Sequence, residues 1–221
     1  MRTKLDEQFI NINNSLFEMS AFVEQVIANT NKALLEQDVE LANKVVESIE
    51  QIYDKEKGIE SLCLKLILLQ QPVAGDLRFV SATLKIIAEL TLIGGLVFEI
   101  SEMVLINADT PYIIDLKYIL KMSELTTKMI KESIEAFINK DLIQANSVIA
   151  SDDKLDNFFE IVKNDLLLLI NENINNGDQA IHLIMIAKFF ERIGDHATNI
   201  AEWVIFSLVG VYKNINQREQ L

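Results

Sequence analysis

The chain opens with apolar residues spaced alternately four and three positions apart. This spacing places their side chains on one side of a helix, where they form a continuous stripe. The positions are Leu5, Phe9, Ile12, Leu16, Met19, Val23 and Val26. The stripe predicts a long amphipathic helix that packs against partner helices.

Five further helical segments follow, separated by short breaks. Asp38 is a favourable N-cap residue for the second helix, and Pro72 ends that helix because proline interrupts helical hydrogen bonding. A linker at residues 107–111 and a turn at residues 175–177 mark two later breaks. We predict these helices over residues 38–70, 74–106, 115–139, 141–171 and 178–209.

An internal repeat relates the two halves of the chain. ALLEQDVELANKVVES at residues 33–48 aligns with AFINKDLIQANSVIAS at residues 136–151, and an Ile-Gly pair recurs at residues 93–94 and 193–194. Two segments that align in the same order indicate a duplicated unit. We therefore predict an all-α fold of two tandem, related three-helix bundles. The predicted bundles cover residues 1–108 and 112–221.

The composition agrees with long helices. Of the 221 residues, 50% are hydrophobic and only 7 are Gly and 2 Pro, which is little punctuation for sheets and long loops. Cys63 is the one cysteine, so an intramolecular disulfide is excluded.

The net charge of -13 would repel phosphate backbones and anionic lipid surfaces, so we expect no nucleic-acid binding.

Targeting signals are also missing from the sequence pattern. Charged residues occur throughout the first seven positions, where a secretory signal would lead into an apolar stretch. The longest apolar runs stay well below the roughly 20 residues that span a bilayer. We therefore expect a soluble, cytoplasmic protein with no direct membrane insertion.

Two acidic rows are present in the second half. Glu191 and Asp195 lie four residues apart, and Asp152, Asp156 and Glu160 repeat that spacing on the preceding predicted helix. Residues at this spacing share one helix face, so antiparallel packing of the two helices would bring the rows together. Like charges at such spacing repel each other, and a cation between the rows would reverse that effect.

The chemistry of these side chains selects a class of metal. Carboxylate oxygens favour hard cations such as Mg²⁺, Ca²⁺, Mn²⁺ or ferric iron, whereas zinc sites usually contain Cys or His. The principal ligand candidates are Asp152, Asp156, Glu191 and Asp195, and the secondary ones are Glu160, Asn199 and Glu202. In the alternative interpretation, acids at this spacing belong to a solvated face and hold no metal.

Catalytic motifs are not evident. The sequence shows no phosphate-cradling glycine loop, no cysteine cluster and no nucleophile beside a base. Neither His182 nor His196 has an acid three positions before it, as helical di-iron sites require. We therefore predict that the protein is not an enzyme. A metal-dependent, di-iron-like helical enzyme and a metal-free helical scaffold are the alternatives.

Three stretches together resemble the PhoU family of phosphate-transport regulatory proteins. They are MRTKLDEQF at the N-terminus, LLQQPVAGDLR at residues 68–78 and FERIGDHATNIAEWV at residues 190–204, and the likeness covers nearly the whole chain. The resemblance implies an all-helical cytoplasmic protein, often a homodimer, that represses the phosphate-starvation response. It also implies an adaptor between the ATPase subunit of the phosphate-specific ABC transporter and a sensor histidine kinase, held at the inner face of the membrane by these partners.

The same resemblance implies a metal site. PhoU proteins can carry multinuclear metal clusters, notably of iron, on motifs of Glu or Asp followed by Asp four positions later. Asp152 with Asp156 and Glu191 with Asp195 match that motif. In the first half, the repeat places uncharged residues opposite all four acids: Thr91, Gly95, Ile49 and Tyr53. We therefore predict one carboxylate metal site in the second half, with iron as the first candidate ion, and none in the first half. A displaced first-half site would use Glu56, Glu60, Glu99 and Glu102.

Overall fold

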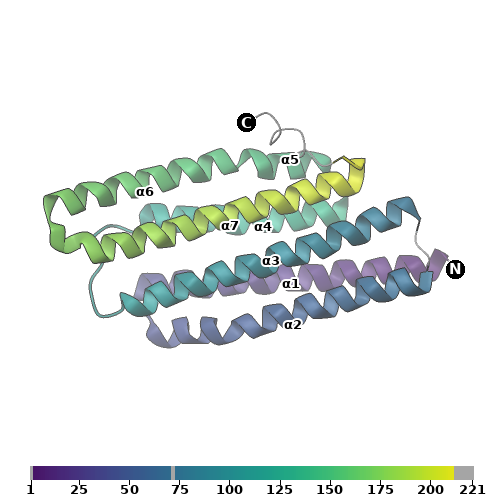
Figure 1. Ribbon diagram of the computed structural model, residues 1–221, viewed down its shortest axis with the longest axis horizontal. Helices are drawn as coiled ribbons and strands as arrows, with labels where there is room; N and C mark the ends of the chain where they lie inside the picture. The colour runs from purple at the N-terminus through teal and green to yellow at the C-terminus, as the bar shows by residue number, and fades with distance from the viewer. Residues whose placement is uncertain (1, 71–72, 212–221) are drawn as a thin grey trace.

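Residues 2–70 and 73–211 are described by the structure, which is a computed structural model. They form long α-helices with one short 3-10 helix, and the described residues contain no strand (Figure 1). The all-α prediction is confirmed. The elements are α1 Arg2–Glu36, α2 Val39–Gln70, α3 Ala74–Ile106, α4 Lys117–Asn139, α5 Leu142–Ala150, α6 Asp152–Glu172, η1 Ile174–Asn176 and α7 Gly177–Val209.

The helices form two bundles that lie side by side along the long axis of the molecule (Figure 1). In the first, α1, α2 and α3 pack on one another; in the second, α4, α5 and α6 surround α7. The bundles meet mainly along α3 and α7, and α1 also contacts α4. One buried apolar cluster runs through both bundles. The helix α7, which carries two of the predicted acids, therefore also forms the junction between the bundles.

Two aspartates act as N-cap residues, a role that their side chains favour. The Asp38 Oδ1 accepts a hydrogen bond from the Leu41 N–H at 3.0 Å, as predicted for the start of the second helix. Asp141 caps α5 in the same way by accepting from the N–H groups of Ile143 and Gln144. These caps satisfy N–H groups that have no partner inside the helix.

The predicted helix over residues 141–171 is broken in the structure, and this expectation was wrong. α5 ends at Ala150 and α6 begins at Asp152, with Ser151 between them. The Ser151 N–H bonds to the Val148 carbonyl, three residues back, and the Ser151 hydroxyl donates to the Ser147 carbonyl. The break makes Asp152 part of the first turn of α6, where unpaired N–H groups and the helix dipole favour a carboxylate.

The central helix α3 is the most apolar of the long helices. Among the described helices, it alone is long and apolar enough to cross a membrane, and 56% of its most apolar window is buried inside the protein. Its buried positions face α1, α2 and α7. This is the burial expected of a core helix in a bundle.

Candidate metal centre

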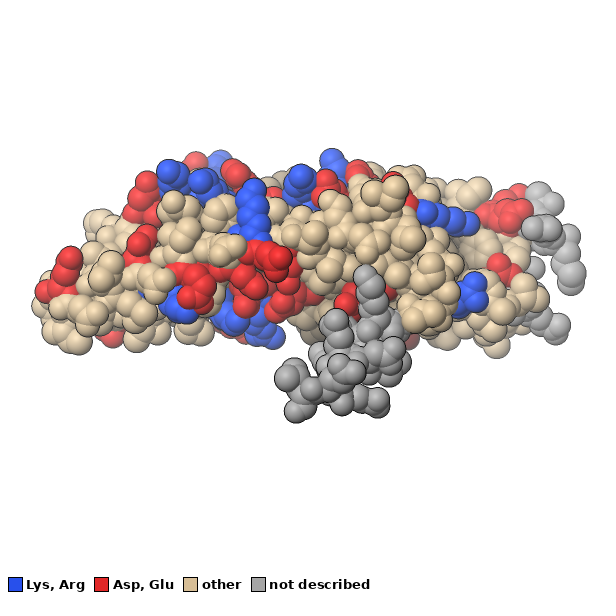
Figure 2. Space-filling view, turned by 90° about the horizontal axis from the view of Figure 1, so that it is seen from above, with Lys and Arg blue, Asp and Glu red and all other residues tan. Residues whose placement is uncertain are grey.

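The principal acidic residues come together between α6 and α7. These two helices pack against each other and run in opposite directions (Figure 1). Asp152 and Asp156 project from the first half of α6, and Glu191 and Asp195 project from the middle of α7. Figure 2, which views the molecule from above, shows acidic side chains gathered left of the centre, with basic side chains above and below them.

The carboxylates are close enough to change one another's protonation. Partial burial, together with the negative charges of Asp195, Asp156 and Glu191, raises the pKa of Asp152 to about 6. The pKa values of Asp156 and Asp195 are also raised, first by burial and then by the charge of Glu191, while the ammonium group of Lys188 opposes the rise. The cluster therefore holds more negative charge than its surroundings neutralise.

Two oxygens of the cluster are buried without a hydrogen-bond partner. They are Asp152 Oδ1 and Glu191 Oε2. The other oxygen of Glu191 accepts a hydrogen bond from the Lys188 ammonium at 2.5 Å, and the Glu191 side chain is only 14% exposed. An unpaired buried carboxylate oxygen is unfavourable, and a cation would provide the missing partner. These oxygen donors therefore fit a hard metal ion.

The carboxylates of the cluster are not arranged around one common ion position. Among the described residues, no group of three or more His, Cys, Asp or Glu side chains is arranged to hold a metal, either between α6 and α7 or around the first-half residues Glu56, Glu60, Glu99 and Glu102. Binding between α6 and α7 would therefore require the carboxylates to rotate toward a shared ion. Asp156 and Asp195 lie at the exposed side of the cluster and have room for that rotation.

Gly194 explains why the two helices approach closely beside the acids. A Cβ atom at this position would lie 2.1 Å from Leu155 Cδ2 and 3.5 Å from Asp152 Oδ1. In the first bundle, a Cβ at Gly94 would lie 2.7 Å from Ile52 Cδ1. Each glycine thus lets its helix pack against the apolar side chain of the neighbouring helix. The equivalence of Ile52 and Leu155 agrees with the sequence repeat.

The first bundle has no carboxylate at the equivalent positions. Ile49 and Tyr53 stand three residues before and one after Ile52, as Asp152 and Asp156 do around Leu155. Opposite them, the Thr91 hydroxyl donates to the Ile87 carbonyl of its own helix, and a Cβ at Gly95 would meet nothing within 4 Å. The groove that is acidic in the second bundle is therefore uncharged at these four positions in the first.

Comparison with known proteins decides the family. The PhoU domain matches the chain twice, over residues 16–104 and 119–204. The chain belongs to the PhoU family. It is 30% identical over 207 residues to the phosphate-specific transport system accessory protein PhoU homolog of Clostridium acetobutylicum, covering 93% of this chain and 94% of that one. The homolog from Aquifex aeolicus is 33% identical over 189 residues, covering 86% of both chains.

Solved PhoU structures have the same fold. The crystal structure of PhoU from Pseudomonas aeruginosa superposes with a TM-score of 0.88 at 26% identity, covering 93% of this chain and 99% of that one. PhoU from Streptococcus pneumoniae gives a TM-score of 0.86 at 21% identity, covering 95% and 99%. The PhoU arrangement of helices thus extends over both bundles.

The secondary ligand candidates lie apart from the four principal acids. Glu160 is on the next turn of α6, more than half exposed, and pairs with Lys163. The Asn199 amide donates to Glu89 Oε2 of α3 at 3.3 Å. Glu202 is buried near the end of α7. The charge of Glu160 still reaches the cluster, because it contributes to the raised pKa of Asp156.

A polar contact between the bundles was not anticipated from the sequence. His196 Nδ1 lies 2.6 Å from Glu89 Oε2, which also accepts the Asn199 hydrogen bond. His196 follows Asp195 directly, so this contact ties the helix of the acidic cluster to α3 of the other bundle. The partners are 107 residues apart, and no local spacing in the sequence could have paired them.

Proposed function

We propose that this PhoU-family protein is a cytoplasmic accessory protein of phosphate-specific transport that represses the phosphate-starvation response. It would act as an adaptor between the ATPase subunit of the transporter and a sensor histidine kinase, with no enzymatic activity of its own. The observation that carries the proposal is the match of the PhoU domain to both halves of the chain. The relatives that share this match are named for the phosphate-specific transport system.

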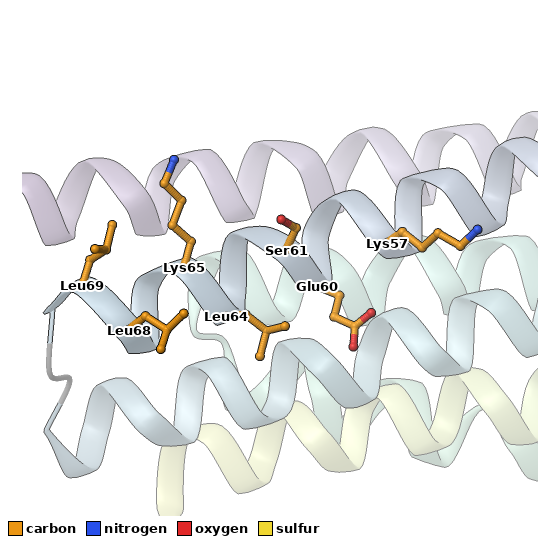
Figure 3. A pocket seen from close by; sticks show the side chains of 7 residues that line it. All are labelled: Lys57, Glu60, Ser61, Leu64, Lys65, Leu68 and Leu69. Carbon is orange, nitrogen blue, oxygen red and sulfur yellow. The ribbon is translucent and has the colours of Figure 1, made fainter.

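An exposed face of α2 supports a docking role. Leu64, Leu68 and Leu69 are 49%, 80% and 59% exposed there. Lys57 and Lys65 stand beside them around a shallow hollow (Figure 3). Exposed apolar side chains in a contiguous group commonly mark protein contact surfaces. We propose that this α2 face contacts the ATPase subunit of the transporter. Separately, we propose that the functional unit is a homodimer.

We further propose that Asp152, Asp156, Glu191 and Asp195 hold a metal ion, with iron first and Mn²⁺, Mg²⁺ or Ca²⁺ as the other candidates. The unpaired oxygens of Asp152 and Glu191 support this proposal. When bound, the ion would neutralise the carboxylates and join α6 to α7. The chain's own contribution is to position these carboxylates, since Gly194 holds the helices close and His196 fixes α7 on Glu89.

The adaptor proposal is tested by affinity capture from extracts of the native cells. The immobilised full-length protein is expected to enrich the ATPase subunit of the phosphate transporter. Leu68→Glu should reduce that enrichment, whereas Ile143→Glu, which changes an 84% exposed residue on α5, should not. Failure of the unchanged protein to enrich any transporter subunit would refute the adaptor role. Equal capture by Leu68→Glu would refute only the assignment of the α2 face.

A further inference from the structure

A cavity lies at the end of the molecule where both bundles contribute walls. It has a volume of about 330 Å³. Its lining comes from the beginnings of α1 and α3 and from the ends of α4 and α7. Three lining residues, Gly75, Asp76 and Arg78, belong to the LLQQPVAGDLR stretch, and neither the metal centre nor the α2 face uses these three. The cavity size falls within the range of small-molecule sites, roughly 300 to 1,000 Å³.

One wall of the cavity is aromatic. The ring of Phe79 packs edge-on against Phe9, with centroids 4.8 Å apart, and stacks on Phe137 at 5.2 Å. The three rings come from α1, α3 and α4, and all three line the cavity. Such a wall favours an apolar or aromatic group in the space beside it.

Two cationic residues, Arg78 and Lys140, also line the cavity and give part of its lining a positive charge. The Arg78 Nε is buried and has no hydrogen-bond partner. Lys140 ends α4 in a left-handed conformation with φ 57°, directly beside the cavity. A buried guanidinium N–H without an acceptor favours an anion that supplies one.

The one acidic residue among the described lining residues is already engaged. Asp76 Oδ2 accepts the Val73 N–H at 3.4 Å, at the first turn of α3. Asn13 also lines the cavity, and its Oδ1 is buried without a partner. Two cationic residues against one carboxylate leave the cavity with a net positive charge. The aromatic wall and the unpaired Asn13 Oδ1 lie beside these charges. A positive cavity is unusual in a chain whose net charge is -13.

We infer that this cavity binds a small organic anion, with its negative group on Arg78 and Lys140 and its apolar body against Phe9, Phe79 and Phe137. The volume exceeds what inorganic phosphate alone would fill, so the ligand class carries an aromatic or comparably apolar body. Because the walls come from both bundles, an occupied cavity would link them at the end of the α3–α7 junction. The inference is independent of the metal centre between α6 and α7.

Calorimetric titration of the chelator-treated, full-length protein tests the inference with three probes. Phenyl phosphate combines both features, inorganic phosphate lacks the ring, and phenol lacks the charge. Phenyl phosphate is expected to bind at least about tenfold more tightly than either of the others, since each lacks one of the two contacts. Chelator treatment removes metal that could bind phosphate at the other site.

Variants locate the binding. Arg78→Gln and Lys140→Gln are each expected to weaken phenyl phosphate binding by about tenfold, because a charge-assisted hydrogen bond is lost. Lys85→Gln is the matched control, since Lys85 lies on α3 outside the cavity with its ammonium group 5.8 Å from the Trp203 ring. Should Arg78→Gln fail to fold, Lys140→Gln decides alone, because Lys140 is at an exposed helix end.

Three results would overturn the inference. The first is no binding of phenyl phosphate at millimolar concentration, which would mean a cavity that holds water only. The second is equal affinity for phenyl phosphate and inorganic phosphate, because the aromatic wall would then contribute nothing. The third is an equal loss of affinity in Lys85→Gln and Lys140→Gln, which would indicate attraction to the protein surface in general.

Discussion

Lys188 places a positive charge against the acidic cluster. Its ammonium group bonds to Glu191, opposes the raised pKa values of Asp156 and Asp195, and lies 5.2 Å from the centre of the Phe159 ring. A cation bound by the same carboxylates would be repelled by this charge. Lys188 would therefore limit how tightly the proposed site holds a metal.

Replacing Lys188 by Met is expected to raise the affinity for Mn²⁺ by roughly fivefold at low salt, because about 1 kcal/mol of repulsion between two charges is removed. Calorimetric titration measures the change. The control is Lys163→Met, since Lys163 lies over the same Phe159 ring at 5.6 Å but pairs with the outer residue Glu160. An equal gain in Mn²⁺ affinity in both variants would show that the effect is not specific to Lys188.

Gly194 is the residue that sets the distance between α6 and α7. An alanine Cβ would overlap Leu155, which is fully buried and cannot move aside freely. Gly194→Ala is therefore expected to lower the free energy of unfolding by about 1 to 3 kcal/mol. Gly95→Ala, where the added carbon meets nothing within 4 Å, should be neutral or stabilising by up to about 1 kcal/mol because alanine favours helices. Urea unfolding of both variants checks this contrast, and a stable Gly194→Ala protein would contradict the close packing.

At the scale of helices, the α6–α7 pair makes the stability of the metal-free protein depend on pH. Burial and the neighbouring carboxylates raise the pKa of Asp152 from 3.8 to about 6 in the folded protein. Between these values the folded state binds more protons than the unfolded state, so the free energy of unfolding falls as the pH rises. The raised pKa values of Asp156 and Asp195 act in the same direction.

We expect chelator-treated protein to lose on the order of 1 kcal/mol of stability between pH 4 and pH 7, after allowance for the partial exposure of Asp152. Asp152→Asn should flatten this dependence. Added metal should restore stability at pH 7 because it binds only the folded state. Urea unfolding at a series of pH values measures all three effects. The raised pKa of Asp152 would be contradicted if the free energy of unfolding of the unchanged protein rose over this range and rose as steeply in Asp152→Asn.

The helices themselves could largely be predicted, because their patterns are local. The expected bounds of 74–106 coincide with α3, and Asp38 caps α2 as its side chain suggested. The break at Ser151 could not be predicted, since no Pro or Gly stands there and the helix periodicity continues through it. It depends on the hydrogen bonds of one serine to its own helix.

At the scale of the whole molecule, the repeat predicted two related bundles but not how they join. The junction of α3 with α7 and the Glu89–His196 contact depend on packing between distant segments, which leaves no local pattern. The cavity at the end of the molecule was also not predicted, because its lining is drawn from four helices. The pairing of the acids was predictable because each pair shares a helix face.

The two bundles share a fold but differ in charge at equivalent positions. Four carboxylates face each other between α6 and α7, while Ile49, Tyr53, Thr91 and Gly95 occupy the corresponding positions between α2 and α3. A metal bound in one bundle would therefore make the protein chemically asymmetric. In the adaptor role proposed above, such asymmetry would present different faces to the two partners.

Elemental analysis by plasma mass spectrometry tests this asymmetry most directly. It is applied to the protein purified without an affinity tag, to Asp195→Ala and to Glu99→Ala, which removes an acid of the first bundle. Metal retained by the unchanged protein and by Glu99→Ala, and lost from Asp195→Ala alone, is the predicted result. Metal retained by Asp195→Ala, or absent from all three proteins, would contradict a carboxylate metal site in the second bundle.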